Sequence, residues 1–165
     1  MKKITEKDLT IRSARPEDVA SILVMVHELA DFECLADEVV ATEADYQESL
    51  FGEKPVAEAL VAIFEGQLIG YAIFFSTFST FIGRAGLWLE DLYVRSEFRR
   101  QGVGRKLLKA GGEIARERGA GRYEWSVLDW NRNAIDLYEQ MGGEIMEEWR
   151  IVRLDRGAVE TLSEK

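Results

Sequence analysis

The stretch EFRRQGVGRKLLK, residues Glu97–Lys109, gathers five basic side chains around two glycines and then turns into a helical pattern. An apolar run typical of a strand, Leu87–Val94, comes before it, and the helical pattern extends over about Val103–Glu117. A turn between a strand and a helix leaves backbone N–H groups free beside the positive end of the helix. Gly102 and Gly104 let an anion approach the backbone without interference from a Cβ. The stretch therefore predicts a turn that binds a phosphate-bearing ligand, although an exposed arginine-rich turn would contain the same residues.

Length and composition set the class of protein. A chain of 165 residues, 47% hydrophobic and 31% charged, is expected to form one soluble globular domain over residues 1–165. No apolar run is long enough to cross a membrane, and the first twelve residues lack the apolar core of a signal peptide, so we expect a cytoplasmic protein. Cys34 and His27 are the only residues of their kinds. An internal disulfide is therefore impossible, and we expect no metal site.

The net charge of −9 is distributed unevenly. Eight acidic residues and no lysine or arginine lie between Glu28 and Glu48, whereas Arg95–Lys109 contains six basic residues and one acidic residue. This separation predicts two ligands of opposite charge, although a solvated acidic surface would explain many of the carboxylates equally well. Nucleic acid is a poor partner, because the chain is acidic overall and its basic zone is short.

Hydrophobic periodicity and turn signals predict an ordered series of strands and helices. Strands are expected at Thr10–Arg15, at Ala59–Ser76 as a hairpin turning at Glu65-Gly66, at Leu87–Val94, at Tyr123–Leu128 and at Trp149–Leu154. Helices are expected at Pro16–Phe32, Thr42–Phe51, Val103–Glu117 and Asn131–Met141. An antiparallel block followed by alternating strands and helices predicts an α/β fold with one mixed twisted sheet flanked by helices.

Two motifs carry a resemblance to a known family. The run Arg99-Arg100-Gln101-Gly102-Val103-Gly104 matches the pattern [QR]-x-x-G-x-[GA], and Asn131, Ala134, Tyr138 and Gly142 match N-x-x-A-x-x-x-Y-x-x-x-G. In both motifs the chain resembles the GNAT N-acetyltransferase superfamily. From about Ile11 to Leu154 it is similar to the diamine (spermidine/spermine) and thialysine N-acetyltransferase branch. The resemblance implies the GNAT fold, with a parallel splayed central pair of strands, and a homodimer.

The resemblance also implies acetyl-CoA as co-substrate. In this family the pantetheine arm adds to a splayed strand edge that corresponds here to Leu92-Tyr93-Val94, and the pyrophosphate binds N–H groups from about Gln101 to Arg105. The cofactor-binding residues implied are Leu92, Tyr93, Val94, Arg99, Arg100, Gln101, Gly102, Val103, Gly104, Arg105, Asn131 and Tyr138. Asn131 can instead be a simple helix cap, at least one of the arginines can be solvated, and Leu92–Val94 can also be buried strand.

Acetyl transfer to an amine needs a proton acceptor, because an amine with a pKa of about 10.4 is mostly protonated at neutral pH. Alternation along a strand is expected to send Glu90 and Asp91 to opposite faces. By resemblance we choose Glu90 as the acceptor, directly or through water, and Tyr138 as the acid that protonates the leaving thiolate. Glu90 can alternatively pair with an arginine, and Tyr138 can complete an apolar helix face.

The acidic segment predicts the substrate class. It resembles the polyamine-binding loop of the family, and carboxylates along a groove attract a chain of ammonium groups. The substrate-binding residues expected are Phe32, Glu33, Asp37, Glu38, Glu90, Asp91 and Trp130. We expect a small cationic amine, either a polyamine or diamine or a thialysine-like compound. Protein, peptide or aminoglycoside acetylation and a non-catalytic coenzyme A sensor remain alternatives.

Overall fold

The computed structural model describes residue 4 and residues 8–163 of the chain. These residues divide between two compact units, Met1–Ser126 and Val127–Lys165. Among the described residues, no helix combines the length and the apolar composition needed to cross a bilayer.

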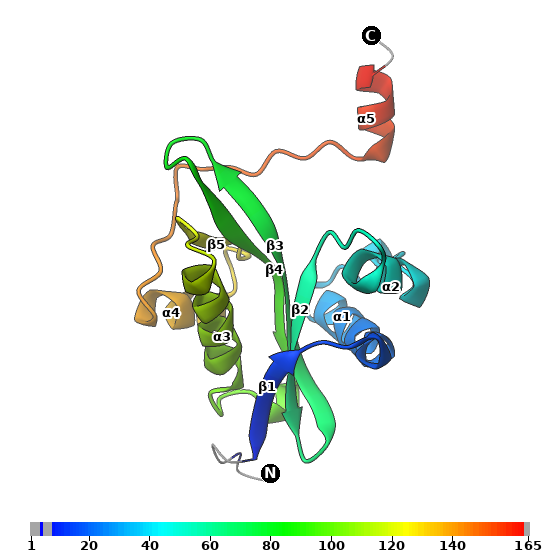
Figure 1. Ribbon diagram of the computed structural model, residues 1–165, viewed down its shortest axis with the longest axis vertical. Helices are drawn as coiled ribbons and strands as arrows, with labels where there is room; N and C mark the ends of the chain where they lie inside the picture. Colours follow the sequence, from blue (N-terminus) through cyan, green and yellow to red (C-terminus); the bar gives the residue numbers. More distant parts are fainter. Residues whose placement is uncertain (1–3, 5–7, 164–165) are drawn as a thin grey trace. The chain divides into compact units, whose positions relative to one another are not determined.

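The first unit is built on one five-stranded open sheet (Figure 1). Its strands lie in the spatial order in which they occur along the chain, and they are β1 (Leu9–Ser13), β2 (Glu58–Phe64), β3 (Gln67–Ser79), β4 (Arg84–Val94) and β5 (Tyr123–Trp125). All neighbouring pairs are antiparallel except β4 and β5, which are parallel. Glu65 and Gly66 both have positive φ angles, as a two-residue hairpin turn requires. The mixed sheet and this hairpin confirm the predicted fold class.

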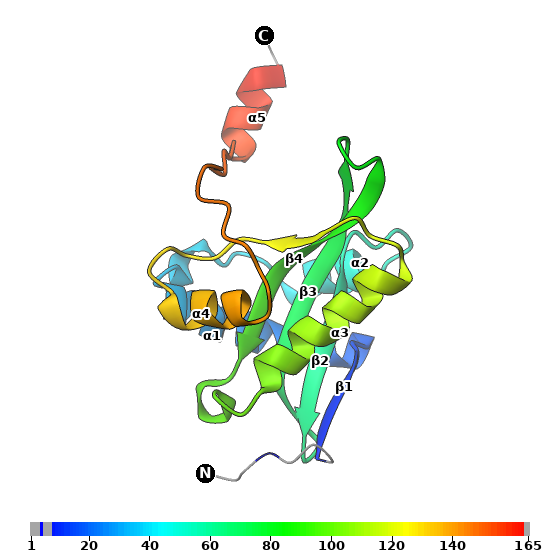
Figure 2. The ribbon, with the colours of Figure 1, turned by 90° about the vertical axis from the view of Figure 1, so that its left-hand side faces the viewer.

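Helices cover both faces of the sheet (Figures 1 and 2). Helices α1 (Val19–Glu33) and α2 (Glu43–Phe51) lie on one face, and α3 (Val103–Glu117) lies on the other. On the first face, apolar side chains of both helices pack against alternate residues of the strands, and the buried members of this core are Ile22, Met25, Leu50, Ala59, Val61, Tyr71, Ile73 and Tyr93. This face therefore contains two tyrosines deep in an otherwise apolar layer.

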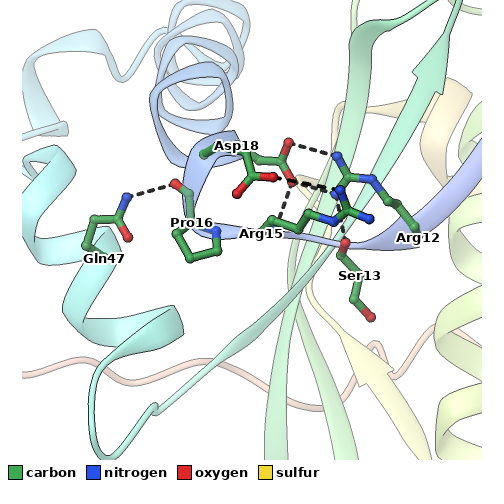
Figure 3. Close-up of polar contacts among 7 residues, drawn as sticks. Arg12, Ser13, Arg15, Pro16, Asp18 and Gln47 are labelled. Carbon is green, nitrogen blue, oxygen red and sulfur yellow. Dashed lines mark hydrogen bonds and ion pairs between the residues drawn. The ribbon is translucent and has the colours of Figure 1, made fainter.

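A buried aspartate fixes the start of α1 (Figure 3). Asp18 ends the short 3-10 turn Pro16–Asp18, and its carboxylate accepts two hydrogen bonds from the Arg12 guanidinium, at 2.6 and 3.0 Å. It also accepts from the Arg15 backbone N–H at 2.7 Å. Gln47 of α2 donates to the Pro16 carbonyl, so that both helices are tied to the same turn. The Arg12 guanidinium lowers the pKa of the Asp18 carboxyl below its ordinary value.

The second unit contains α4 (Arg132–Gln140) and α5 (Arg156–Ser163). The prediction of a last strand at Trp149–Leu154 is wrong, because these residues have no regular secondary structure. Apolar and polar residues alternate along this segment as in a strand. A strand forms only beside a hydrogen-bonded partner strand, and the described part of the chain offers none here. The strand expected at Tyr123–Leu128 is shorter in the structure, because β5 ends at Trp125. Helix α5 has no counterpart among the predicted elements.

Candidate active site

A β-bulge in β4 decides which face of the sheet receives the acidic residues. Ile73 of β3 lies opposite Asp91, but the next residue, Phe74, lies opposite Leu89, so Glu90 is an extra residue in the ladder. The strict alternation expected from the sequence is therefore interrupted at this point. Because of the bulge, Asp91 shares the face of Ile73, which packs against α1 and α2, and Leu89 lies on the opposite face.

Asp91 lies in a negative and partly buried environment. The Tyr71 hydroxyl of β3 donates a hydrogen bond to its Oδ2 atom at 3.4 Å. Burial, followed by the nearby charges of Glu90 and Glu33, raises the pKa of Asp91 to about 6, and the Tyr71 hydrogen bond opposes that rise. Tyr46 of α2 interacts with the charge of Asp91 as well. Burial and this charge together raise the pKa of Tyr46 to about 12. Side chains from four elements therefore converge on one carboxylate.

Two of the other predicted acids contribute to this environment in different ways. Glu33 is the last residue of α1, and burial raises the pKa of its carboxyl. Glu90 is exposed at the bulge, and its carboxylate accepts a hydrogen bond from the Trp88 indole N–H at 2.9 Å. Within the described residues, no lysine or arginine forms an ion pair with Glu33, Glu90 or Asp91. These three carboxylates therefore have no basic partner in the part of the chain that the structure describes.

The remaining residues of the acidic segment lie farther out. Asp37 and Glu38 are exposed in the 3-10 turn Ala36–Glu38 that follows α1. Phe32 is 41% exposed near the end of α1, and the guanidinium of Arg99 lies 4.8 Å from the centre of its ring. The charge of Glu33 therefore acts on Asp91, whereas Asp37 and Glu38 lie at the surface.

The edge of β4 is open beyond the bulge. Strand β5 pairs with β4 only from Leu87 to Leu89, and among the described residues no strand continues along the β5 side of Glu90–Val94, whose other edge is paired with β3. This segment contains Leu92, Tyr93 and Val94, the residues expected to accept an added chain at the strand edge. A ligand with amide groups can form hydrogen bonds to such an edge as a further strand would.

The turn after β4 presents backbone groups at the start of α3. Gly102 caps the helix with a φ of 81°, and Arg100 has a φ of 61°. A Cβ built on Gly102 meets no atom within 4 Å, so the space above this backbone is open. The Gln101 side chain accepts a hydrogen bond from the Ile4 N–H, while its buried amide nitrogen has no partner within the described chain. Open space, a helix start and a donor without a partner fit an anionic group at this turn.

The basic side chains of this turn are placed differently from one another. Arg99 points back onto the protein, because its Nε donates to the Val94 carbonyl at 2.8 Å and its guanidinium lies 4.8 Å from the centre of the Phe32 ring and 5.3 Å from that of Tyr93. Arg100 and Arg105 are exposed. Val103 is buried in the first turn of α3, which begins there and also contains Gly104. Arg99 therefore links the end of β4 to the end of α1.

Three predicted residues belong to the second unit. Asn131 caps α4, and its side chain accepts a hydrogen bond from the Ala134 N–H at 3.3 Å. Tyr138 is buried on α4 with Ile135 on the same face, and Trp130, just before the helix, is 52% exposed. The helix-cap interpretation of Asn131 is confirmed.

Sequence reasoning missed three aromatic residues of this site: Trp88, Tyr71 and Tyr46. Trp88 stands two positions before Glu90, so period-two spacing could have indicated it. Tyr71 lies inside the apolar run of a central strand, where a tyrosine looks like ordinary core. Tyr46 lies on a helix far away in sequence, and nothing in the sequence links it to Asp91.

Comparison with known proteins places the chain in a family. A profile described as Acetyltransferase (GNAT) family matches residues 23–143. The chain is 38% identical to the thialysine N-epsilon-acetyltransferase of Sus scrofa, over 94% of this chain and 97% of that protein. It is 30% identical to the L-ornithine N5-acetyltransferase NATA1 of Arabidopsis thaliana, over 92% of this chain and 86% of that protein.

Solved structures agree at the level of the fold. An integron cassette protein of V. cholerae superposes with a TM-score of 0.79 at 20% identity, over 96% of this chain and 99% of that one. A soil-metagenome aminoglycoside acetyltransferase superposes with a TM-score of 0.73 at 17% identity, over 91% of this chain and 96% of that one. The predicted resemblance to the diamine and thialysine branch is confirmed by the sequence relatives, and this chain is an N-acetyltransferase that belongs to the GNAT family.

Proposed function

We propose that this enzyme moves an acetyl group from acetyl-CoA to a primary amine of a small cationic substrate, a polyamine, diamine or thialysine-like compound, by direct attack in a ternary complex. The observation that carries the proposal is the group of three carboxylates, Glu33, Glu90 and Asp91, which no lysine or arginine of the described chain neutralises. The ammonium group of an amine substrate would supply the positive charge that these carboxylates lack. The curated relatives named above act on thialysine and ornithine according to their names, and both of those compounds are amines.

Residues of the first unit would hold acetyl-CoA, which supplies the acetyl group as a thioester. The open edge at Leu92–Val94 offers backbone hydrogen bonds to its amide-containing arm, and the turn from Gln101 to Arg105 offers N–H groups to its phosphates. Arg100 and Arg105 can add charge there, since both are exposed. Arg99 would support the turn indirectly, because its Nε is hydrogen-bonded to the Val94 carbonyl and its guanidinium stacks on the Phe32 ring.

The chain's own groups would handle the protons. Asp91 holds the substrate ammonium, and Glu90, fixed by the Trp88 indole, accepts the proton that the amine must lose, directly or through water. We assign proton donation to the leaving sulfur to Tyr138, on the strength of its place in the second motif and its burial on α4. Asp37, Glu38 and Trp130 would attract the distal part of the substrate from exposed positions.

The test is release of coenzyme A from acetyl-CoA with spermine, spermidine, putrescine, thialysine, ornithine, an aminoglycoside and a lysine peptide. We expect rapid release with one or more of the small amines and a rate that falls as salt rises, because carboxylate–ammonium attraction is screened. Asp91→Asn should lower kcat/KM about tenfold or more, as removal of one charged partner does. Tyr138→Phe should lower kcat and leave KM nearly unchanged.

Two results would contradict the proposal. Turnover of the lysine peptide alone would make the enzyme a peptide acetyltransferase. Tight coenzyme A binding without turnover of any amine would make it a sensor.

A homodimer is a further part of the proposal. Its support is a group of exposed large apolar side chains near the end of the second unit, which includes Met146, Trp149, Ile151, Val152, Leu154, Val159 and Leu162. Large apolar side chains exposed close together in sequence are typical of a protein interface. The cytoplasmic location stays a prediction of the sequence.

A further inference from the structure

Tyr71 carries a buried hydroxyl that the packing of the core does not need. Its side chain is fully buried in the middle of β3, between α1 and the sheet. A phenylalanine would fill this space equally well, and burial of a hydroxyl costs free energy unless the group is hydrogen-bonded. The partner of this hydroxyl is the Oδ2 atom of Asp91. We infer that Tyr71 is a positioning residue, which orients the Asp91 carboxylate and keeps it charged for the amine substrate.

The register of the sheet explains why the two side chains meet. Tyr71 lies directly opposite Tyr93, and Ile73 lies opposite Asp91, so Tyr71 and Asp91 are diagonal neighbours on one face. If Glu90 were paired as an ordinary member of the ladder, it would lie opposite Ile73, and Asp91 would lie on the other face of the sheet. The bulge therefore places the Asp91 carboxylate on the same face as Tyr71, and the Tyr71 hydroxyl holds that carboxylate by a hydrogen bond.

The groups around Asp91 give the hydroxyl a defined electrostatic effect. The groups that face it are Glu90 of β4, Glu33 at the end of α1, Tyr71 of β3 and Tyr46 of α2. Burial and the two glutamates favour the protonated acid, and only the Tyr71 hydrogen bond favours the carboxylate. Burial and the charge of Asp91 also raise the pKa of Tyr71, so that its hydroxyl stays a neutral donor. Loss of the hydroxyl should therefore make Asp91 take up a proton at a higher pH.

Tyr46 offers a matched control. It is a second tyrosine beside Asp91, and its hydroxyl makes no hydrogen bond to that carboxylate within the described residues. Tyr46→Phe and Tyr71→Phe each remove one oxygen atom near the same acid. Only Tyr71→Phe removes a donor to it.

The inference rests on the proposed amine acetyltransfer, so the experiment has one measurement that is independent of activity. The Asp91 carboxyl would be titrated by ¹³C NMR in the parent and in both variants, and Asp91→Asn would assign its signal. We expect the midpoint to rise by about half a pH unit in Tyr71→Phe and to stay constant in Tyr46→Phe, since a long hydrogen bond to a charged group has a modest effect. An unchanged midpoint in Tyr71→Phe would overturn the inference.

The second measurement is the pH dependence of kcat/KM with the best amine. Below the midpoint, Tyr71→Phe should be about threefold less active than the parent, which is the fold-change of a half-unit shift, and above pH 8 the two should be equal. A uniform loss at every pH would point to a structural defect and contradict the positioning role. In an Asp91→Asn background, Tyr71→Phe should have no further effect on the profile. If the parent turns over no amine, the proposed function fails, and the NMR titration still decides the role of Tyr71.

Discussion

Asp18 and Asp91 are both aspartates on the α1 side of the first unit, and their surroundings have opposite effects. Asp18 accepts three hydrogen bonds from Arg12 and Arg15, which favour its charged form. Asp91 has one neutral donor and two negative neighbours. A carboxylate that is paired within the protein stabilises the folded state. A carboxylate without a positive partner is available to bind a cationic ligand.

Asp91 should reduce stability at neutral pH. Its pKa in the folded protein, about 6, lies above the ordinary value of 3.8, so the folded state binds more protons between these two values. The free energy of unfolding therefore falls as pH rises through this window. We expect Asp91→Asn to raise the free energy of unfolding by about 1–2 kcal/mol at pH 7.5 and by much less at pH 4. Urea unfolding at both values measures this, with the exposed Asp37→Asn as control.

Asp18→Asn should have the opposite effect. The Arg12 guanidinium lowers the pKa of Asp18, so its stabilising contribution is present above the unfolded pKa and is lost as pH falls through the folded one. Removal of this charge leaves Arg12 with a neutral partner, and we expect a loss of about 2–4 kcal/mol at pH 7. The loss should be smaller at pH 3. A variant as stable as the parent in urea at pH 7 would show that the ion pair contributes nothing.

Arg99 should matter for stability even without a ligand. Its guanidinium stacks on Phe32 and Tyr93 while its Nε donates to the Val94 carbonyl. We expect Arg99→Ala to lower the free energy of unfolding by about 1–2 kcal/mol and the exposed Arg105→Ala to change it by less than about 0.5 kcal/mol. The comparison is made by urea unfolding of the free protein. Equal small effects would place Arg99 among the surface charges.

At the scale of the element, α3 permits a comparison of two glycines within one helix. Gly102 caps the helix at a φ of 81°, whereas Gly112 lies inside it with nothing within 4 Å of a Cβ. Gly102→Ala should cost about 1–2 kcal/mol because a side chain is strained at positive φ, and Gly112→Ala should stabilise by about 0.5–1 kcal/mol. Thermal unfolding of the two variants should show shifts of opposite sign. Shifts of the same sign would contradict the assignment of the helix start.

Elements with strong local signals were predicted from the sequence, and elements that depend on a distant partner were not. Thr42 caps α2 as expected, and Glu65-Gly66 turns the hairpin. The expected strand at Trp149–Leu154 has the right alternation and lacks a partner in the described chain. The bulge at Glu90 could not be predicted, because it exists only relative to the register of β3.

At the scale of the whole molecule, the family and the open strand edge were predictable from two motifs, and the acidic site was predictable only in part. The charge distribution indicated Glu33, and the strand run Leu87–Val94 indicated Asp91, but neither pattern showed that the two residues would lie near each other. They also could not show that a tyrosine of the core would donate to Asp91, because burial hides the function of such a residue from sequence patterns.

The exposed apolar residues of the second unit lead to a prediction about assembly. Trp149 and Val152 are 73% and 89% exposed, and burial of each in a dimer interface would contribute about 1.5–3 kcal/mol. We expect the parent to sediment as a dimer and Trp149→Ser with Val152→Ser to raise the dimer Kd at least about tenfold. Glu147→Gln, at an exposed polar position of the same segment, is the control. A monomeric parent at micromolar concentration would contradict the homodimer.

The extra residue at Glu90 decides how two consecutive acidic residues fit into one strand. If Glu90 were paired as an ordinary member of the ladder, it would lie opposite Ile73, and Asp91 would lie opposite Ala72 on the other face of the sheet. Deletion of Glu90 would instead leave a regular strand with Asp91 still opposite Ile73. The bulge therefore adds a second carboxylate to β4 without moving Asp91 away from the α1 face, so a one-residue insertion into a regular strand is enough to change the site from one acidic residue to two.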